Sequence, residues 1–481
     1  MSWSWLWTAL SLLNYALALV AAVSILRRPR EPRAMFAWIL ALLLLPFVGL
    51  LAYLLAGDPR FKRTRRKRHR RQKRISRSLR RQIEAMRKRF GEDATEEERA
   101  LAEIAEVAVR TSDYMLTTGN QVDIYFEDDD NFNAIMEAVR GAKAHIHLEY
   151  YIYQPDETGR QLRDALIAKA KEGVEVRLLV DFVGTFNWTR SFRRTFTDHG
   201  IQVASFLPAV PWGGRWRVNF RNHRKIVVVD GHVGFTGGQN IGDEYRGRRE
   251  KFGPFRDTHM RIEGPAVQQL QEIFVEDWNF TRHEDLSGDE YFPNARAAGE
   301  QTVQVIPSGP DRNPRIMHHV LLAAVASARE SIAIITPYFV PDSVIVVALQ
   351  SAAYRGVRVQ LLVPATTDHR IVLWAGRSYY QELTESGVEI YEYDHALLHS
   401  KVMMVDNNWG MVGSANMDQR SFRINFEVTA LLYDHALACH LREDFEALLK
   451  KARRVRPESP DHWTFGESVK LGLARLLSPL L

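Results

Sequence analysis

Residues 222–245 read NHRKIVVVDGHVGFTGGQNIGDEY, and residues 398–422 read LHSKVMMVDNNWGMVGSANMDQRSF. In both stretches a histidine precedes an asparagine by 17 residues, and six positions align without a gap. The aligned pairs are His223 and His399, Lys225 and Lys401, Asp230 and Asp406, Gly237 and Gly413, Gly238 and Ser414, and Asn240 and Asn416. Six positions repeated at one spacing indicate an internal duplication of the chain.

A second repeated pattern lies upstream of each stretch. In the first copy, AHIHLEYYIYQPD at 144–156 leads through a helical pattern to GVEVRLLVD at 173–181. In the second copy, SIAIITPYFVPDS at 331–343 leads through a helical pattern to GVRVQLLVP at 356–364. Apolar strands on both sides of a helix are typical of a covered, largely parallel sheet. The sequence therefore predicts an α/β fold made of two duplicated domains with mixed, mostly parallel sheets.

The two His-x-Lys pairs suit chemistry on a phosphodiester. Residues two apart on a strand face the same side, so His223 projects with Lys225 and His399 projects with Lys401. Lysine supplies a cation for a phosphate oxygen, whereas imidazole can attack phosphorus or carry a proton near neutral pH. We therefore interpret these four residues as catalytic.

The same alignment assigns roles to further residues of the repeat. RDTHMRIEG at 256–264 aligns with FEVTALLYD at 426–434, which makes Asp257 and Glu427 the candidate carboxylates that orient the imidazoles. Close backbone approach and amide donors suit phosphate binding, for which the candidates are Gly238, Ser414, Asn240 and Asn416. Asp230 and Asp406 complete the motifs, either as catalytic groups or as residues that stabilise the turn after each strand.

Two copies of the motif suit a displacement in two steps. One imidazole attacks the phosphodiester to form a phosphohistidine, and the other protonates the leaving alcohol and later deprotonates the incoming one. Two lysines and two amides would hold the phosphate charge. The motif lacks the paired acidic residues of a magnesium site, so we expect neither a metal ion nor another cofactor.

The N-terminal part of the chain is apolar and then strongly basic. Residues 3–26 and 35–56 carry no charged side chain, and each is longer than the roughly 20 residues that cross a bilayer. Residues 60–90 contain 17 Lys or Arg and one Glu, which favours a cytoplasmic position beside anionic lipid. We predict two transmembrane helices in the cell membrane and a cytoplasmic catalytic body; for the first segment a cleaved signal peptide is the alternative. Four arginines lie between the two segments and disfavour a hairpin whose two ends are both in the cytoplasm. They are Arg27, Arg28, Arg30 and Arg33.

Composition limits the remaining possibilities. The net charge is +6 although residues 60–90 alone are far more positive, so the rest of the chain is acidic and does not fit a nucleic-acid-binding body. The single cysteine excludes an internal disulfide. A chain of 481 residues predicts several domains. We place them at 1–59 (transmembrane hairpin), 60–112 (basic segment and linker helix), 113–298 (first repeat) and 299–481 (second repeat with a C-terminal amphipathic segment).

The frames HRKIVVVD and HSKVMMVD, with GGQNIGDEY and GSANMDQRSF after them, resemble the phospholipase D superfamily. GGQNIGDEY, RDTHMRIEG, TPYFVPD and GSANMDQRSFRINFE look like the bacterial cardiolipin synthases within it, and the likeness covers essentially the whole chain. The resemblance implies two phospholipase D-like domains that share one site. It also implies transfer of a phosphatidyl group between two phosphatidylglycerol molecules, giving cardiolipin and glycerol, with His223 as nucleophile and His399 as acid and base.

Residues near the motifs are candidates for contact with a lipid. Tyr151 and Tyr338 follow the repeated strands, and Arg224 and Arg420 are candidates for an anionic headgroup. FLPAVPWGGRWRVNF at 206–220 places aromatic residues beside arginines, and its candidates are Trp212 and Trp216. The C-terminal ESVKLGLARLLSPLL at 467–481 has apolar residues at near-helical spacing, which predicts either an interfacial helix or a helix docked on the body.

Other functions fit parts of this pattern. A phospholipase D-type hydrolase, or a phosphatidyltransferase that uses phosphatidylethanolamine or another alcohol, would share every catalytic residue. The apolar segments and the acidic body disfavour a nuclease of the same superfamily, and two intact motifs disfavour a non-enzymatic membrane scaffold. We expect phospholipid and membrane as partners and no nucleic acid, and we leave the oligomeric state open.

Overall fold

The computed structural model of the chain describes residues 3–27, 32–45, 47–56, 95–207, 219–248, 255–313, 315–367, 369–456 and 464–478. The chain divides into two units, Met1–Phe61 with Leu207–Phe220 and Lys62–Phe206 with Arg221–Leu481. The basic segment 60–90 lies outside the described residues, as do Trp212 and Trp216, so the expectations for them stay predictions.

The described residues of the N-terminal unit include three apolar helices: α1 (Ser4–Leu26), α2 (Pro32–Leu44) and α3 (Val48–Ala56). Within the described ranges one helix, Trp5–Leu26, is long and apolar enough to cross a membrane, by length and composition. The second predicted span, 35–56, is instead divided between α2 and α3. Of the two predicted transmembrane helices, the first is therefore long enough to cross a membrane, and the second is replaced by two shorter helices.

The division between α2 and α3 has local causes. The sequence carries a proline at position 46, which has no N–H for a helical bond, and Phe47 follows with a φ of 64°. The N–H of Phe47 donates to Oδ1 of the buried Asn14 in α1 at 3.1 Å. A Cβ on Gly49 would lie 2.1 Å from the Ala41 carbonyl oxygen, so glycine allows α3 to fold back against α2.

The larger unit contains both repeats. Its first half consists of α5 (Glu96–Ser112), β1 (Thr117–Tyr125), α6 (Asp128–Gly141), β2 (His145–Tyr150), α7 (Glu157–Lys171), β3 (Glu175–Asp181), α8 (Arg190–Thr197), β4 (Gln202–Phe206), β5 (Ile226–Val229), β6 (Val233–Gly237), β7 (Phe255–Arg256), β8 (His259–Glu263) and α9 (Val267–Arg282). Its second half consists of β9 (Gln301–Ser308), α10 (Ile316–Ser327), β10 (Ser331–Ile335), β11 (Phe339–Val340), α11 (Ser343–Tyr354), β12 (Arg358–Pro364), α12 (Arg370–Arg377), α13 (Tyr380–Glu385), β13 (Glu389–Tyr393), β14 (Leu397–Leu398), β15 (Val402–Val405), β16 (Trp409–Gly413), β17 (Met417–Asp418), α14 (Gln419–Arg423), β18 (Glu427–Leu432), α15 (His435–Leu449), β19 (Arg453–Arg454) and α16 (Phe465–Leu476).

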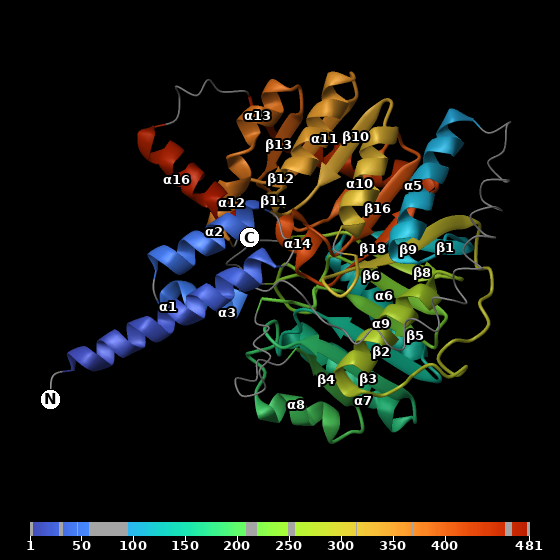
Figure 1. The fold of residues 1–481 in the computed structure, drawn as a ribbon. Helices are drawn as coiled ribbons and strands as arrows, with labels where there is room; N and C mark the ends of the chain where they lie inside the picture. The colour runs from blue at the N-terminus through green and yellow to red at the C-terminus, as the bar shows by residue number, and fades with distance from the viewer. Residues whose placement is uncertain are drawn as a thin grey trace. The chain divides into compact units, whose positions relative to one another are not determined.

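One sheet of 15 strands runs through both halves, in the order β19-β13-β12-β10-β15-β16-β18-β9-β1-β8-β6-β5-β2-β3-β4. The order of the second-half strands from β13 to β9 mirrors that of the first-half strands from β4 to β1, with β9 and β1 as neighbours. Figure 1 shows the teal and green first half and the yellow and orange second half as adjoining parts of this body. The topology confirms the predicted duplicated α/β fold.

Antiparallel pairing dominates this sheet, so the expectation of mostly parallel sheets is wrong. Among the described strands ten neighbouring pairs are antiparallel and four are parallel. Two of the parallel pairs, β2 with β3 and β10 with β12, belong to the strand–helix–strand units that the sequence predicted. The motif itself forms a hairpin, in which Val229 of β5 pairs with Val233 of β6, and so short a connection joins antiparallel strands.

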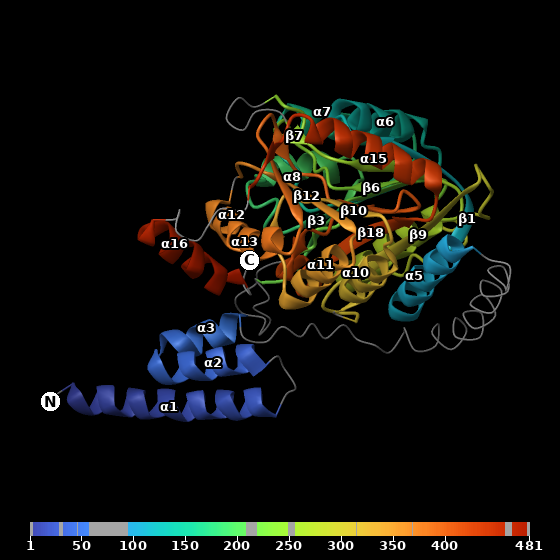
Figure 2. The same ribbon diagram turned by 90° about the horizontal axis from the view of Figure 1, so that it is seen from above.

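Helices cover both faces of the sheet and exclude water from its centre. Figure 2 shows α6, α7 and α15 on one face and α5, α10 and α11 on the other. Between them, all four residues of β5, Ile226–Val229, are buried, as expected for a strand covered on both faces. One cluster of buried apolar residues continues from Ile104 in the first half to Phe445 in the second. The two halves therefore share a hydrophobic core.

The aspartate of the first motif stabilises a turn and lies away from the histidine. Asp230 follows β5, at the end opposite to the His-x-Lys pair, with a φ of 52°. Its carboxylate accepts the backbone N–H groups of Lys143, Ala144 and His145 at 2.8, 2.7 and 2.9 Å. These bonds join the end of β5 to the start of β2, which favours the second of the two roles expected of Asp230, stabilisation of the turn.

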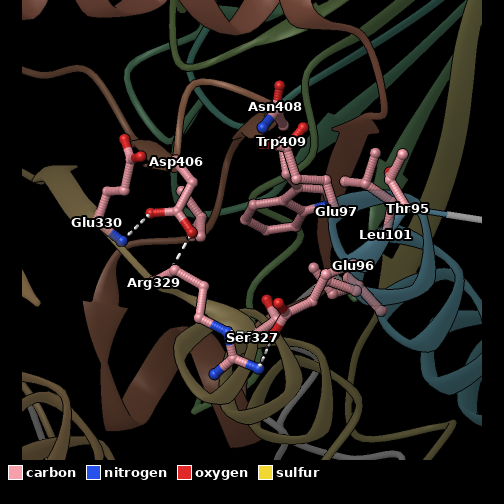
Figure 3. Close-up of a pocket in the computed structure, with 13 residues that line it drawn as sticks. Thr95, Glu96, Glu97, Leu101, Ser327, Arg329, Glu330, Asp406, Asn408 and Trp409 are labelled. Carbon is pink, nitrogen blue, oxygen red and sulfur yellow. Dashed lines mark hydrogen bonds and ion pairs between the residues drawn. The ribbon is translucent and has the colours of Figure 1, made fainter. Parts of the chain in front are cut away.

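The aspartate of the second motif makes the equivalent contacts. Asp406 has a φ of 48°, and its carboxylate accepts the N–H groups of Arg329, Glu330 and Ser331 at 2.6, 2.8 and 2.7 Å. Figure 3 shows this carboxylate pointing at the backbone of Arg329 and Glu330, beside a cavity lined by α5 and the turn after β15. The same geometry in both halves indicates a structural role for both aspartates.

We expect Asp230→Ala and Asp406→Ala to lower the thermal stability of the body. Each change removes the acceptor of three backbone N–H groups, so the free energy of unfolding should fall by about 2–3 kcal/mol. Thermal unfolding of the purified protein, followed by circular dichroism, measures the effect, and Asp230→Asn serves as the milder control. A variant that unfolds at the wild-type temperature but has lost all activity would contradict the structural role.

Candidate active site

The two His-x-Lys segments directly precede β5 and β15, where the halves of the body meet. The N–H of His223 donates to the carbonyl of Phe426 at 2.9 Å. The N–H of His399 donates to the carbonyl of Arg256 at 2.7 Å, next to the short parallel pairing of β14 with β7. The backbone of each histidine is therefore positioned by the opposite half of the chain.

The carboxylates predicted to orient the imidazoles reach them across the same boundary. Nδ1 of His223 lies 3.0 Å from Oε2 of Glu427, and Nδ1 of His399 lies 2.6 Å from Oδ2 of Asp257. Glu427 is 0% exposed and Asp257 is 2% exposed, so both contacts are shielded from water. Each half supplies the carboxylate for the histidine of the other half, and neither half has a complete site by itself.

These contacts set the protonation of the two imidazoles. The partners of Nδ1 of His223 are acceptors, Oε2 of Glu427 and the carbonyl of Ser414, so Nδ1 carries the proton and Nε2 keeps its lone pair in the neutral ring. Nδ1 of His399 faces both Oδ2 of Asp257 and the ammonium of Lys401, the latter at 3.0 Å. Burial lowers the pKa of His223 to about 4 and also lowers the pKa of His399. Near neutral pH, Nε2 of His223 is therefore available to attack an electrophile.

The facing charges keep both carboxyl groups ionised. Burial by itself would raise the pKa of Glu427, but the charge of His223 holds that pKa below its usual value. Burial would likewise raise the pKa of Asp257, but Lys401 and then His399 hold it below its usual value. Each imidazole thus faces an anion that stabilises its protonated form.

Both motif lysines are buried beside the histidines. The ammonium of Lys225 donates to the carbonyl of His223 at 2.7 Å, and that of Lys401 donates to the carbonyl of His399. Burial and the charge of Lys401 together lower the pKa of Lys225 to about 7, against the opposing charge of Glu427. Two buried ammonium groups that repel each other favour an anion bound near both.

Gly238 and Ser414, predicted to contact phosphate, serve the carboxylates instead. Their N–H groups donate to carbonyls within the sheet at 3.1 and 2.9 Å. A Cβ on Gly238 would lie 2.1 Å from Oδ1 of Asp257, so this carboxylate occupies the space of a side chain. At the equivalent position the hydroxyl of Ser414 donates to Oε2 of Glu427 at 2.5 Å.

The two asparagines lie in the loops that follow β6 and β16. Asn240 and Asn416 are 3% and 6% exposed. Oδ1 of Asn240 accepts the N–H of Ile152 at 3.2 Å, which turns its amide NH₂ away from that contact. The N–H of Asn416 donates to the hydroxyl of Ser421 at 3.2 Å. Both asparagines stay candidates for phosphate binding.

Arg224 is buried beneath the site, which corrects the expectation that it binds a headgroup. It is 1% exposed, and its guanidinium forms an ion pair with Asp277. The guanidinium also donates to the carbonyls of Glu427 and Ser308, at 3.0 and 3.2 Å. Arg224 therefore joins the first half of the body to β18 and β9 of the second half.

Arg420 keeps its place among the substrate candidates, and Arg221 joins it. Burial lowers the pKa of Arg420, and the charge of Arg221 lowers it further against the opposing charge of Asp418. Both guanidinium groups also act electrostatically on Tyr151. Sequence reasoning missed Arg221, although it stands two residues before the first histidine.

The predicted pair of tyrosines is not equivalent in the fold. The ring of Tyr151 lies 5.0 Å from that of His223, whereas the ring of Tyr338 lies 5.9 Å from that of His369. Tyr151 thus lines the site, and Tyr338 packs against a neighbouring loop.

Two aromatic residues of the first half lie beside the second histidine and were not singled out from the sequence. The rings of Tyr245 and Phe255 are each 6.0 Å from the ring of His399. Tyr245 ends the quoted stretch 222–245, and this position was the available signal. Aromatic rings from the first half therefore flank both histidines.

Known protein families match most of the body and the N-terminal unit. The family described as cardiolipin synthase, PLD-like domain, matches residues 135–278 and 321–449. The family described as phospholipase D-nuclease N-terminal matches residues 16–57. The two body matches correspond to the two halves of the mirrored sheet.

Individual relatives match nearly the full length. Cardiolipin synthase 2 of Bacillus anthracis is 39% identical over 458 residues, covering 94% of this chain and 88% of the relative. The major cardiolipin synthase ClsA of Bacillus subtilis is 37% identical over 469 residues, covering 96% and 97%. The crystal structure of a phosphatidylserine synthase of Haemophilus influenzae Rd KW20 has a similar fold, with a TM-score of 0.60 and 14% identity, over 80% of this chain and 100% of that one. The chain therefore belongs to the cardiolipin synthase family of phospholipase D-like proteins.

Proposed function

We propose that the chain is a cardiolipin synthase, which transfers a phosphatidyl group from one phosphatidylglycerol to another and releases glycerol. The observation that carries the proposal is the pair of crossed histidine–carboxylate contacts in a chain of this family. Each half supplies one imidazole, one lysine and one carboxylate to a shared site. Two imidazoles at one site suit two successive displacements at phosphorus.

In the first step, Nε2 of His223 attacks the phosphorus of the donor lipid, and the bond from phosphorus to the glycerol oxygen breaks. Burial keeps His223 neutral for this attack. Burial lowers the pKa of His399, so the step uses the doubly protonated fraction of this ring, whose charge faces the Asp257 carboxylate, and this form gives its Nε2 proton to the departing glycerol. The products of the step are glycerol and a phosphatidyl group bound to His223.

In the second step, a hydroxyl of the acceptor phosphatidylglycerol attacks the same phosphorus. Nε2 of His399 accepts the proton of this hydroxyl, and the bond between phosphorus and His223 breaks. The site returns to its starting protonation, and cardiolipin leaves. Lys225 and Lys401 hold the phosphate oxygens through both steps, together with the amides of the two asparagines.

The phosphate of the acceptor lipid is assigned to Arg221 and Arg420. These two cations lie near Tyr151, which lines the site, and they repel each other. A second phosphate group beside them would relieve the repulsion. An acceptor that itself carries a phosphate therefore suits this side of the site better than water or a simple alcohol.

Purified wild-type protein given one defined phosphatidylglycerol is expected to form cardiolipin and glycerol in equal amounts. Mass spectrometry of the lipids and an enzymatic glycerol assay measure the two products. Phosphatidic acid without cardiolipin would identify a hydrolase instead. A parallel reaction with added phosphatidylethanolamine tests that lipid as donor or acceptor.

The histidine roles are separated by two alanine variants. His223→Ala and His399→Ala should both abolish turnover, because each step uses both groups. With a donor whose leaving group needs no proton, His399→Ala should still form the covalent phosphatidyl-histidine, and His223→Ala should not. Intact-protein mass spectrometry detects the adduct, with the exposed His232→Ala as control. The opposite pattern would reverse the two roles.

Ser414→Ala should shift the acid limb of the pH–activity profile. The Ser414 hydroxyl helps to lower the pKa of Glu427, so its loss raises that pKa, and Glu427 is then protonated at a higher pH. The acid limb should therefore move to higher pH by about one unit, as for one hydrogen bond. The control is Ser308→Ala, a buried residue that pairs with Glu427 in the sheet. An acid limb shifted equally in both variants would contradict this role of Ser414.

The divided second segment supports a revised membrane topology. At 1.5 Å per residue, α2 is about 20 Å long and α3 about 14 Å, and neither covers the ~30 Å hydrocarbon core. We assign a single crossing to α1 and a re-entrant hairpin to α2 and α3. The arginines at 27–33 and the basic segment 60–90 then both lie on the cytoplasmic side with the catalytic body.

Cysteine labelling tests this topology in intact cells. In a Cys439→Ser background, an impermeant maleimide should label Trp3→Cys but not Arg27→Cys, which reacts only after the membrane is opened. The native Cys439 reports the side of the body in the unaltered chain. Two full crossings with both ends in the cytoplasm would give the reverse, with Arg27→Cys labelled and Trp3→Cys protected.

A further inference from the structure

The C-terminal helix α16 is docked on the body by one face. Leu471 and Ala474 are buried against the body, and the hydroxyl of Tyr379 is bonded to that of Ser478 at 3.4 Å. The guanidinium of Arg475 forms an ion pair with Glu382 at 2.5 Å. These contacts place α16 beside α12 and α13, as both ribbon views show (Figures 1 and 2).

The opposite face of α16 is an exposed apolar stripe. Its members are spaced i, i+4, i+8 and i+11, which puts them on one side of a helix. They are Phe465, Val469, Leu473 and Leu476, with exposed fractions of 87%, 43%, 59% and 76%. We call these four residues the α16 stripe. A stripe of this kind on a helix that already buries its other face needs an apolar partner.

The surroundings of the stripe match a lipid surface. Lys470 and Arg475 lie on either side of it along the helix, and their cations rest on the rings of Trp374 and Tyr379 at 3.8 and 4.3 Å. Cations at the edges of an apolar face, with a partly exposed tryptophan close by, are typical of helices that lie in the headgroup region of anionic bilayers. Ile371 of α12, one helical turn before Trp374, is also exposed, at 45%.

The area of the stripe argues against a second copy of the chain. A stable protein interface buries about 800 Å² on each partner. At roughly 200 Å² for a fully exposed large side chain, the exposed fractions of the four residues fall short of that area. A bilayer has no such minimum, since it can bury a single helix face.

The stripe is also connected to the active site. α12 packs on β11, where a Cβ on Gly376 would lie 2.8 Å from the carbonyl oxygen of Phe339. β11 pairs with β17, in the register Phe339 to Met417, and Asn416 directly precedes Met417. A lipid surface at α16 and α12 would therefore lie close to the phosphate-binding loop, which suits a substrate that stays in the bilayer.

We infer that the α16 stripe inserts into the acyl-chain region of an anionic membrane and presents the second half of the active site to lipid. The inference depends on the proposed phosphatidyl transfer only in its claim that the lipid substrate reaches the active site from the membrane. Insertion of the α16 stripe is measured without turnover, so a stripe that does not insert can be distinguished from a chain that does not transfer phosphatidyl groups.

Quenching by brominated lipid tests insertion on the full chain. In a Cys439→Ser background, Leu473→Cys and the exposed α15 residue Glu443→Cys each carry an environment-sensitive fluorophore. The protein is reconstituted in vesicles of phosphatidylcholine and phosphatidylglycerol with bromines on the acyl chains. Emission from position 473 should be blue-shifted and quenched, and emission from position 443 should be neither.

Two results would overturn the inference. Emission from position 473 that resembles position 443 means that the stripe faces water. A blue shift that brominated chains do not quench means that protein covers the stripe, either α1–α3 or a second copy.

Charge variants give a second measurement. Leu473→Glu with Leu476→Glu should lower cardiolipin formation in vesicles about tenfold, because two carboxylates oppose insertion into lipid. The same variant in detergent micelles should keep wild-type activity, as should Ser468→Glu, which adds a charge outside the stripe, in either system. An equal loss of activity in micelles and vesicles would mean that the two substitutions damage the body. The quenching measurement would then decide whether the α16 stripe inserts into lipid.

Discussion

The crossed bonds from His223 to Glu427 and from His399 to Asp257 are the constraint on which the rest of the body depends. Both carboxylates are shielded from water, and a buried carboxylate without a cationic or hydrogen-bonding partner is strongly unfavourable. Because each imidazole partner comes from the opposite half, neither half supplies both members of a histidine–carboxylate pair. The continuous sheet through β9 and β1 holds the halves together so that both bonds form at once.

The duplication is not exact, and its differences bear on the chemistry. In the first half a glycine at 238 leaves room for Asp257, whereas in the second half the hydroxyl of Ser414 donates to the longer Glu427. The carbonyl of Ser414 also lies 3.0 Å from Nδ1 of His223. The two imidazoles therefore have different surroundings, which supports the proposed division into nucleophile and proton carrier.

Apolar surface in this chain is used for two different purposes. In the body it packs against a sheet that is covered on both faces, and the buried cluster crosses from one half to the other. In α1 and on the α16 stripe, the apolar side chains are not covered by the rest of their own unit, so contact with lipid would bury them favourably. One polar group, Asn14, is buried among the N-terminal helices, where it accepts the N–H freed at the break between α2 and α3.

Several features were predictable because they are local in the chain. The spacing of His223 and Lys225 along a strand sets the direction of both side chains, and repetition of that spacing identifies the second copy. Asp257 and Glu427 followed from the same alignment. Arg224 could not be judged in this way, since its burial depends on Asp277 of α9 and on carbonyls of β9 and β18.

The sequence by itself determined the duplication, the candidate catalytic residue types and the apolar N-terminal segments, because these are patterns of neighbouring residues. Only the tertiary structure decided which carboxylate meets which imidazole, that Asp230 and Asp406 bind backbone at the far ends of their strands, and that antiparallel pairs outnumber parallel ones. Each of these depends on contacts between residues far apart in the chain. Spacing along a strand says which way a side chain points, but not which segment it meets there.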